Sequence, residues 1–89
     1  MKHLVKRKGH TEIFDDRKIY ASVYAACLSL RMTQEEGELI AEMVTSEVAD
    51  VVKDFHEVDA HTIHKHVVVS LNKFNPDAAY LYDTHKDIF

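Results

Sequence analysis

The sequence predicts an α+β fold in which a small N-terminal β-hairpin packs on a four-helix, bundle-like core. Three observations favour this class. The 89 residues include only two glycines and one proline and are 46% apolar, as in compact, mostly helical proteins. Two short runs with β-branched or aromatic residues flank Gly9 near the N-terminus. From Asp16 onward, apolar residues recur at helical spacing.

The hairpin comes first. Its two runs are HLVKR and TEIF, and the KGH between them lets Gly9 supply the positive φ of a tight turn. A helix is then expected to begin at Asp15 or Asp16, because an aspartate there can serve as its N-cap. The apolar face of this helix comprises Ile19, Val23, Ala26, Cys27 and Leu30.

Three further helices are expected. Thr33 and Glu36 form a capping box that opens the second helix, whose apolar stripe comprises Leu39, Ile40, Met43, Val44, Val48, Val51 and Val52. The helical pattern weakens over residues 53–59, and Asp59 or a neighbour can cap a third helix bearing Ile63, Val67 and Leu71. Asn75 and Pro76 end that helix and begin a fourth, which carries Ala78, Leu81 and Tyr82. At this length we expect residues 1–89 to form a single domain.

The charge, cysteine content and hydrophobicity of the chain argue against several classes of function. A net charge of −4 argues against a general nucleic-acid binder, which normally shows a basic balance. The single cysteine, Cys27, cannot form an internal disulfide, so a reducing, cytoplasmic location is the simplest expectation. No stretch approaches the 18 or so apolar residues that a membrane-spanning helix needs, so no membrane partner is expected.

Basic residues gather around the hairpin and the start of the first helix. Five of the eleven lysines and arginines fall within residues 5–19: Lys6, Arg7, Lys8, Arg17 and Lys18. A helix N-terminus flanked by such side chains is suited to bind phosphate groups. Glu12 and Asp15 would repel phosphate, but they could accept a hydrogen bond from an adenine amine at the other end of a nucleotide. The simpler alternative is an exposed hairpin kept soluble by edge-strand lysines.

The segment VKRKGHTEIFDDRKI resembles the opening signature of the ATP-cone domain family. The match begins with Leu4 in place of the family's first valine, a conservative departure, and continues at Lys6, Arg7, Gly9, Glu12, Phe14, Asp15, Lys18 and Ile19. The resemblance implies a regulatory module that senses ATP against dATP, as found at the N-terminus of ribonucleotide reductase large subunits and in a repressor of their genes. Two positions depart from the family pattern: Lys8 stands where aspartate is usual, and Ala60 where a hydroxyl residue is common.

The resemblance also implies roles for individual residues. Lys6 and Arg7 would reach the phosphates, Glu12 and Asp15 would lie near adenine, and Lys18 would meet phosphate or ribose. The apolar side chains of Leu4, Val5 and Ile19 would enclose the base. His64 would help to distinguish nucleotides, and Lys86, in the last helix, would add a phosphate contact. The effector would be ATP or dATP, with Mg²⁺.

The chain is therefore expected to be a regulatory nucleotide-binding domain and not an enzyme, because it lacks a recognisable constellation of nucleophile, base and metal ligands. His61, His64 and His66 are close in sequence, but without a carboxylate or cysteine on the same face they seldom form a metal site. The implied partners are an adenine nucleotide and either a second copy or a ribonucleotide reductase subunit. The alternative is a helical protein-interaction module that has lost nucleotide binding.

Overall fold

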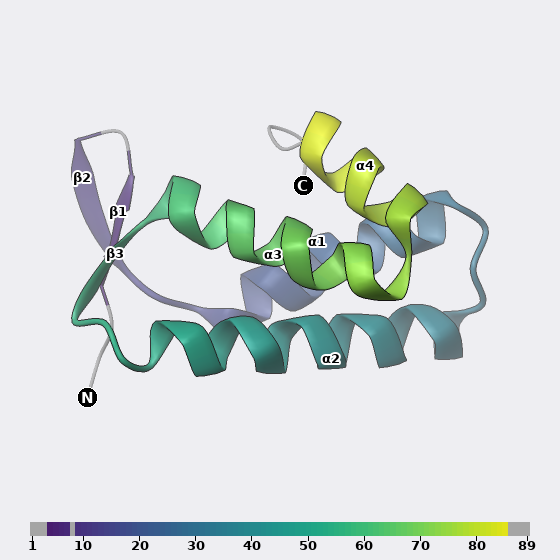
Figure 1. Cartoon of the computed structure of the whole chain (residues 1–89), viewed down its shortest axis with the longest axis horizontal. Helices are drawn as coiled ribbons and strands as arrows, with labels where there is room; N and C mark the ends of the chain where they lie inside the picture. The colour runs from purple at the N-terminus through teal and green to yellow at the C-terminus, as the bar shows by residue number, and fades with distance from the viewer. Residues whose placement is uncertain (1–3, 8, 86–89) are drawn as a thin grey trace.

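The computed structural model describes residues 4–7 and 9–85 (Figure 1). Within these residues the chain forms a three-stranded sheet and four helices, which confirms the predicted α+β class. The elements are β1 (Leu4–Arg7), β2 (His10–Ile13), α1 (Asp16–Ser29), α2 (Gln34–Val52), β3 (Glu57–Asp59), α3 (Ala60–Phe74) and α4 (Pro76–Thr84).

The predicted hairpin is confirmed, and it belongs to a larger sheet. β1 and β2 pair antiparallel with Val5 opposite Glu12, and Gly9 in the turn has a φ of 84°. The expectation of a hairpin alone was wrong, because β3 pairs parallel to β1 and places Val58 beside Val5. The strand order is β2-β1-β3. A three-residue strand whose partner lies some fifty positions earlier is too short to leave a periodic signal in the sequence.

Side-chain caps fix the helix starts. Asp15 caps α1 and Asp59 caps α3, as predicted, and Pro76 takes the predicted first position of α4. The Asn75 side chain also caps α4, which we did not predict. At α2 the Thr33 hydroxyl accepts from the Glu36 amide at 3.1 Å, so this half of the predicted capping box is confirmed. The Glu36 carboxylate accepts from the Thr33 hydroxyl at 3.2 Å.

The end of α1 is closed by a left-handed residue. The Met32 amide donates to the Cys27 carbonyl at 3.4 Å and the Arg31 amide to the Leu28 carbonyl at 2.9 Å, the pair of bonds that defines a Schellman motif. Arg31 occupies the position after the cap with a φ of 64°, where glycine is usual. An arginine there is strained because its Cβ approaches the neighbouring backbone.

The core lies between the helices, which contact one another in a ring: α1 with α2, α2 with α3, α3 with α4, and α4 with α1. The sheet lies at one end, and α3 begins directly beside it (Figure 1). The largest side chains with less than 2% exposure are Leu71, Val23, Val44, Val48, Val52, Val67 and Cys27.

Two residues that we expected in the apolar stripes are exposed. Leu39 is 56% exposed and Leu30 is 37% exposed, so their placement in the core was wrong. In α2 the buried face instead includes Gly37 and Ala41. A Cβ on Gly37 would lie 3.2 Å from the Tyr24 ring, because α1 and α2 approach closely at that point. Small residues therefore define the α1–α2 contact, and hydrophobicity alone did not reveal it.

We expect Leu71→Ala to lower the free energy of unfolding by about 2–5 kcal/mol, because Leu71 is fully buried and its truncation leaves a cavity. In a protein of this size each kcal/mol corresponds to roughly 4–8 °C in Tm. Thermal unfolding followed by circular dichroism measures the loss. The matched control is Val69→Ala on the same helix, where the side chain is 65% exposed and the change should be small. Equal losses in the two variants would contradict the assigned core.

Arg31→Gly should stabilise the fold by about 0.5–1 kcal/mol, because glycine relieves the strain of the left-handed conformation at some cost in chain entropy. Urea unfolding measures the gain. Ser29→Gly, inside the last turn of α1, should instead destabilise by up to about 1 kcal/mol. A destabilised Arg31→Gly variant would show that the arginine side chain contributes more than the backbone strain costs.

Candidate functional site

The sheet separates the predicted site residues onto two faces, because side chains alternate along each strand. Val5 and Val58 point toward the helices and are 3% and 7% exposed. Glu12 lies opposite Val5 and so shares this inner face. Lys6, the next residue along β1, points outward and its side chain is 65% exposed.

Glu12 and Lys18 come together on the inner side. Lys18 is in the first turn of α1, and its Nζ lies 3.7 Å from Oε1 of Glu12 on β2. The Lys18 amide donates to the Asp15 carbonyl at 3.2 Å. The first turn of α1 thus places a cation beside a strand carboxylate, at the helix end whose dipole favours anions.

Lys6 faces a different carboxylate. Its Nζ lies 3.8 Å from Oε1 of Glu57 on β3, and the strand register puts it beside Asp59, the residue that caps α3. Lys6 and Lys18 therefore occupy opposite faces of the sheet.

The Asp15 carboxylate is bound by Arg17, two positions later in the chain. Its Oδ1 accepts from the Arg17 amide and from Arg17 Nε, each at 3.0 Å, and its Oδ2 accepts from a terminal guanidinium nitrogen at 3.0 Å. These hydrogen bonds from Arg17 lower the pKa of the Asp15 carboxyl, and the Lys18 charge adds to the effect. Capping and ion pairing thus occupy both oxygens of Asp15.

His64 lies against α4. Its Nε2 is 2.9 Å from Oδ1 of Asp83, and its ring stacks on Tyr82 with a centroid distance of 5.2 Å. The Tyr82 hydroxyl lies 3.3 Å from Oγ of Ser22, one turn beyond Lys18 on α1. His64 therefore connects α3 to α4 and, through Tyr82, to the helix that carries Lys18.

The remaining predicted residues divide into three groups. Val5 and Ile19 belong to the hydrophobic core, with 3% and 6% exposure, whereas Leu4 is half-buried. Arg7 pairs with His10 in the sheet, but its side chain is outside the described part of the structure. Lys86 lies outside the described residues altogether.

Four partners of the predicted site residues were missed. Arg17 could have been found, since an arginine two positions after an N-cap aspartate can reach its carboxylate. Glu57 carries no such signal, because its contact with Lys6 depends on the unpredicted strand β3. Tyr82 and Asp83 meet His64 only through the packing of α4 on α3. Their positions in the chain give no indication of this contact.

Each described cation of the site already has a carboxylate partner. Exposed pairs of this kind stabilise a protein by only about 0–1 kcal/mol, so a multiply charged phosphate group can replace the carboxylates. The residues that the structure describes contain no group of three or more His, Cys, Asp or Glu that could hold a metal ion. The arrangement is suited to bind an anion reversibly.

The fold defines a small sheet-capped helical module with lysine and arginine side chains at the sheet and the start of α1. Comparison with protein-family models matches residues 2–85 to the ATP cone domain. Because the match covers nearly the whole chain, the chain belongs to this family of nucleotide-sensing regulatory domains, whose effectors are ATP and dATP. No match was found among curated proteins or among solved structures. Among the described residues, no helix is both long and apolar enough to cross a membrane.

The Asp15–Arg17 pair predicts a defined acid response. Since the pKa of Asp15 is lowered in the folded state, its charge stabilises the fold above the unfolded-state pKa of about 3.9. This contribution disappears as the pH falls through the lower, folded-state value. Asp15→Asn keeps a capping oxygen but loses the charge, so the variant should be less stable than the wild type at pH 7, and the difference should shrink as the pH falls below about 3.9. Urea unfolding at several pH values measures the difference.

Arg17→Met provides the control for that experiment. In its background, Asp15→Asn should cost less than in the wild type, because the ion pair is already absent. A cost that is the same at every pH, or the same with and without Arg17, would contradict the assigned cause.

Proposed function

We propose that the chain binds ATP or dATP at the hairpin and the start of α1, and that it acts as an allosteric sensor. The observation that carries this proposal is the family match over residues 2–85. We further propose that residues 1–89 act as one ATP-cone domain linked to ribonucleotide reductase activity or its regulation, through a reductase subunit or a second copy. The nucleotide would arrive with Mg²⁺, which neutralises part of the phosphate charge.

Geometry supports a phosphate site around Lys18. The side chain is 65% exposed, and it lies in the first turn of a 14-residue helix, at the end whose dipole favours an anion. Lys6 is equally exposed, and its ion pair with Glu57 has a 3.8 Å separation that a phosphate can displace. By their positions in the family motif, we assign Arg7 and Lys86 to the same phosphate chain.

The adenine base would lie on the side of Glu12 that faces away from the phosphate groups. When phosphate attracts Lys18, the Glu12 carboxylate loses this cation and can accept a hydrogen bond from an adenine amine. Asp15 is a weaker candidate for this contact because Arg17 already occupies both of its oxygens. Among the apolar residues assigned to the base, half-buried Leu4 is the most accessible, but it shares the outer face of β1 with Lys6 and not the face of Glu12. Val5 and Ile19 would act by shaping the core beneath Glu12.

His64 is proposed to discriminate between ATP and dATP. Its ring is held on two sides, by Asp83 at 2.9 Å and by the face of Tyr82. A histidine held in this way has a fixed orientation, which discrimination by a single hydroxyl group requires. Because the same contacts join three helices, a ligand that moves His64 would also shift the packing of α4. This coupling supports a sensing role.

Thermal unfolding with and without ATP, dATP or GTP, each with Mg²⁺, tests the proposal. A ligand at a hundred times its Kd stabilises the native state by about 2.7 kcal/mol, which raises Tm by roughly 10–20 °C in a protein of this size. We expect a large shift with the adenine nucleotides and a small one with GTP. No shift with any nucleotide would overturn the proposal and favour the alternative of a helical protein-interaction module.

Lys6→Ala and Lys18→Ala test the site itself. Each should weaken nucleotide binding by about 1.5–3 kcal/mol through loss of a charge-assisted hydrogen bond, as measured by calorimetric titration. Arg31→Gly is the matched control, because it removes one positive charge at the far end of α1, roughly 20 Å from Lys18. Unchanged affinity in both lysine variants would refute the site assignment even if nucleotide binds.

A further inference from the structure

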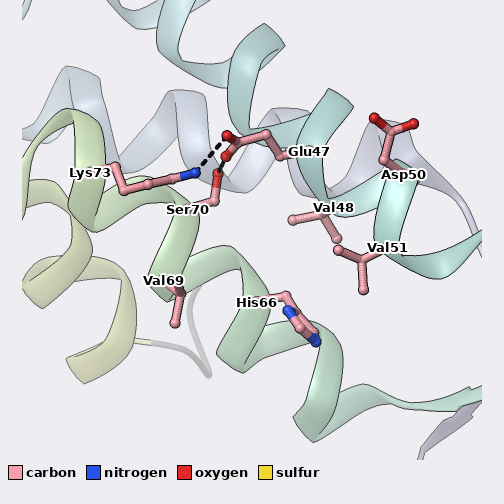
Figure 2. A pocket seen from close by; sticks show the side chains of 8 residues that line it. All are labelled: Glu47, Val48, Asp50, Val51, His66, Val69, Ser70 and Lys73. Carbon is pink, nitrogen blue, oxygen red and sulfur yellow. Dashed lines mark hydrogen bonds and ion pairs between the residues drawn. The ribbon is translucent and has the colours of Figure 1, made fainter.

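A shallow groove runs along the outside of α2 and α3, away from the proposed nucleotide site. It consists of two hollows that share Glu47. The first has a volume of about 290 Å³ and is lined by Glu47, Val48, Asp50, Val51, His66, Val69, Ser70 and Lys73 (Figure 2). The second has a volume of about 480 Å³ and is lined by Leu39, Glu42, Met43, Ser46, Glu47 and Phe74. We call the two together the α2–α3 groove.

Two regular stripes of side chains form its walls. On α2 the wall residues recur every three or four positions from Leu39 to Val51, and on α3 they do so from His66 to Phe74. Large apolar side chains in these stripes are exposed: Leu39 by 56%, Val69 by 65% and Phe74 by 37%. Exposed apolar groups gathered along one groove are typical of an interaction surface.

A polar bridge crosses the middle of the groove. Lys73 Nζ donates to Glu47 Oε1 at 2.6 Å, and the Ser70 hydroxyl donates to Glu47 Oε2 (Figure 2). Ser70 is only 5% exposed, so the bridge is anchored in the helix contact. These bonds lower the pKa of the Glu47 carboxyl and keep it charged. The buried residues Val44, Val48, Val67 and Leu71 set the spacing of α2 and α3, and the bridge adds a polar contact at the surface of that packing.

The charge around the groove is negative. Its described lining residues include three carboxylates, Glu42, Glu47 and Asp50, and one lysine, Lys73, which Glu47 already neutralises. Glu42 and Asp50 are exposed at the rim, where Oδ1 of Asp50 lies 3.5 Å from Nζ of Lys53. Asp50 is therefore partly neutralised, and Glu42 supplies most of the negative charge at the rim. The whole chain has a net charge of −4, so a second copy would meet unfavourable charge here.

We propose that the α2–α3 groove binds a basic amphipathic helix of another protein. Leu39 to Val51 spans roughly 18 Å at about 1.5 Å per residue, which equals three to four turns of such a helix. Apolar residues spaced i, i+3, i+4 and i+7 on the partner would enter the two hollows. Lysines or arginines beside them would face Glu42 and would compete with Lys53 for Asp50. The helix would thereby become a fifth helix packed on the ring of four.

The test uses a synthetic peptide of leucine, alanine and lysine, about 14 residues long, with its leucines on one helical face. Amide chemical shifts of the isotopically labelled chain are recorded by NMR during titration. We expect the shifts to fall within residues 39–51 of α2 and residues 66–74 of α3, and not on the hairpin. The affinity should decrease with added salt, because the rim charges are exposed.

Variants and control peptides make the result decisive. The double change of Leu39→Ser and Val69→Ser should weaken peptide binding about tenfold or more. Tyr80→Ser is the matched control, because it removes an aromatic side chain that is 73% exposed on α4, and it should have no effect. A peptide with the same composition but scrambled leucine positions, or with glutamate in place of lysine, should bind much more weakly.

Three outcomes would overturn the proposal. The scrambled or acidic peptide could bind as well as the designed one. The double variant could bind as tightly as the wild type. Sedimentation could instead show a dimer of the chain that Val69→Ser dissociates, which would identify a second copy as the occupant. None of these outcomes depends on nucleotide binding, so the experiment stands apart from the proposed sensing function.

Discussion

The parallel pairing of β1 with β3 is the constraint on which the rest of the structure depends. A two-stranded hairpin is marginally stable alone, and here the third strand completes it: the Leu4 amide donates to the His56 carbonyl at 2.9 Å, and Val58 lies beside Val5 in the register. Both valines are buried against the helices. Because β3 leads directly into α3, the same pairing fixes the start of that helix beside Lys6. The N-terminal strands and a helix some fifty residues later thus form one unit.

This sheet also organises the charges. It directs Lys6 to the outer face, where Glu57 lies, and leaves Lys18 beside Glu12 on the inner face. Each lysine is held near its position by a carboxylate that stabilises the fold only weakly at the surface. Such pairs limit the repulsion between cations, and under the proposed function phosphate would replace the carboxylates. Contacts from His64 through Tyr82 to Ser22 then link α3, α4 and α1, and Ser22 lies one turn beyond Lys18.

Chain length sets a second constraint, since a small chain buries a smaller share of its surface than a large one. The helices compensate by close approach at small residues, among them Gly37, Ala41 and Ala78, which are buried in helix contacts. Close packing leaves little room between the helices, so Leu39, Val69 and Phe74 remain on the outer faces of α2 and α3. The α2–α3 groove and the tight core therefore have the same cause: four short helices and a small sheet cannot cover all of the apolar surface that the helices carry.

Local patterns in the sequence determined the four helices, their caps and the turn at Gly9. Capping residues, the Asn75-Pro76 pair and helical periodicity act over a few positions, so these helices and their ends can be predicted from local sequence. The motif from Leu4 to Ile19 likewise indicated the family. Only tertiary structure decided the third strand, the exposure of Leu39, and the partners of Lys6 and His64. Glu57 and Asp83 reach those residues through strand pairing and helix packing across long separations, which no local pattern encodes.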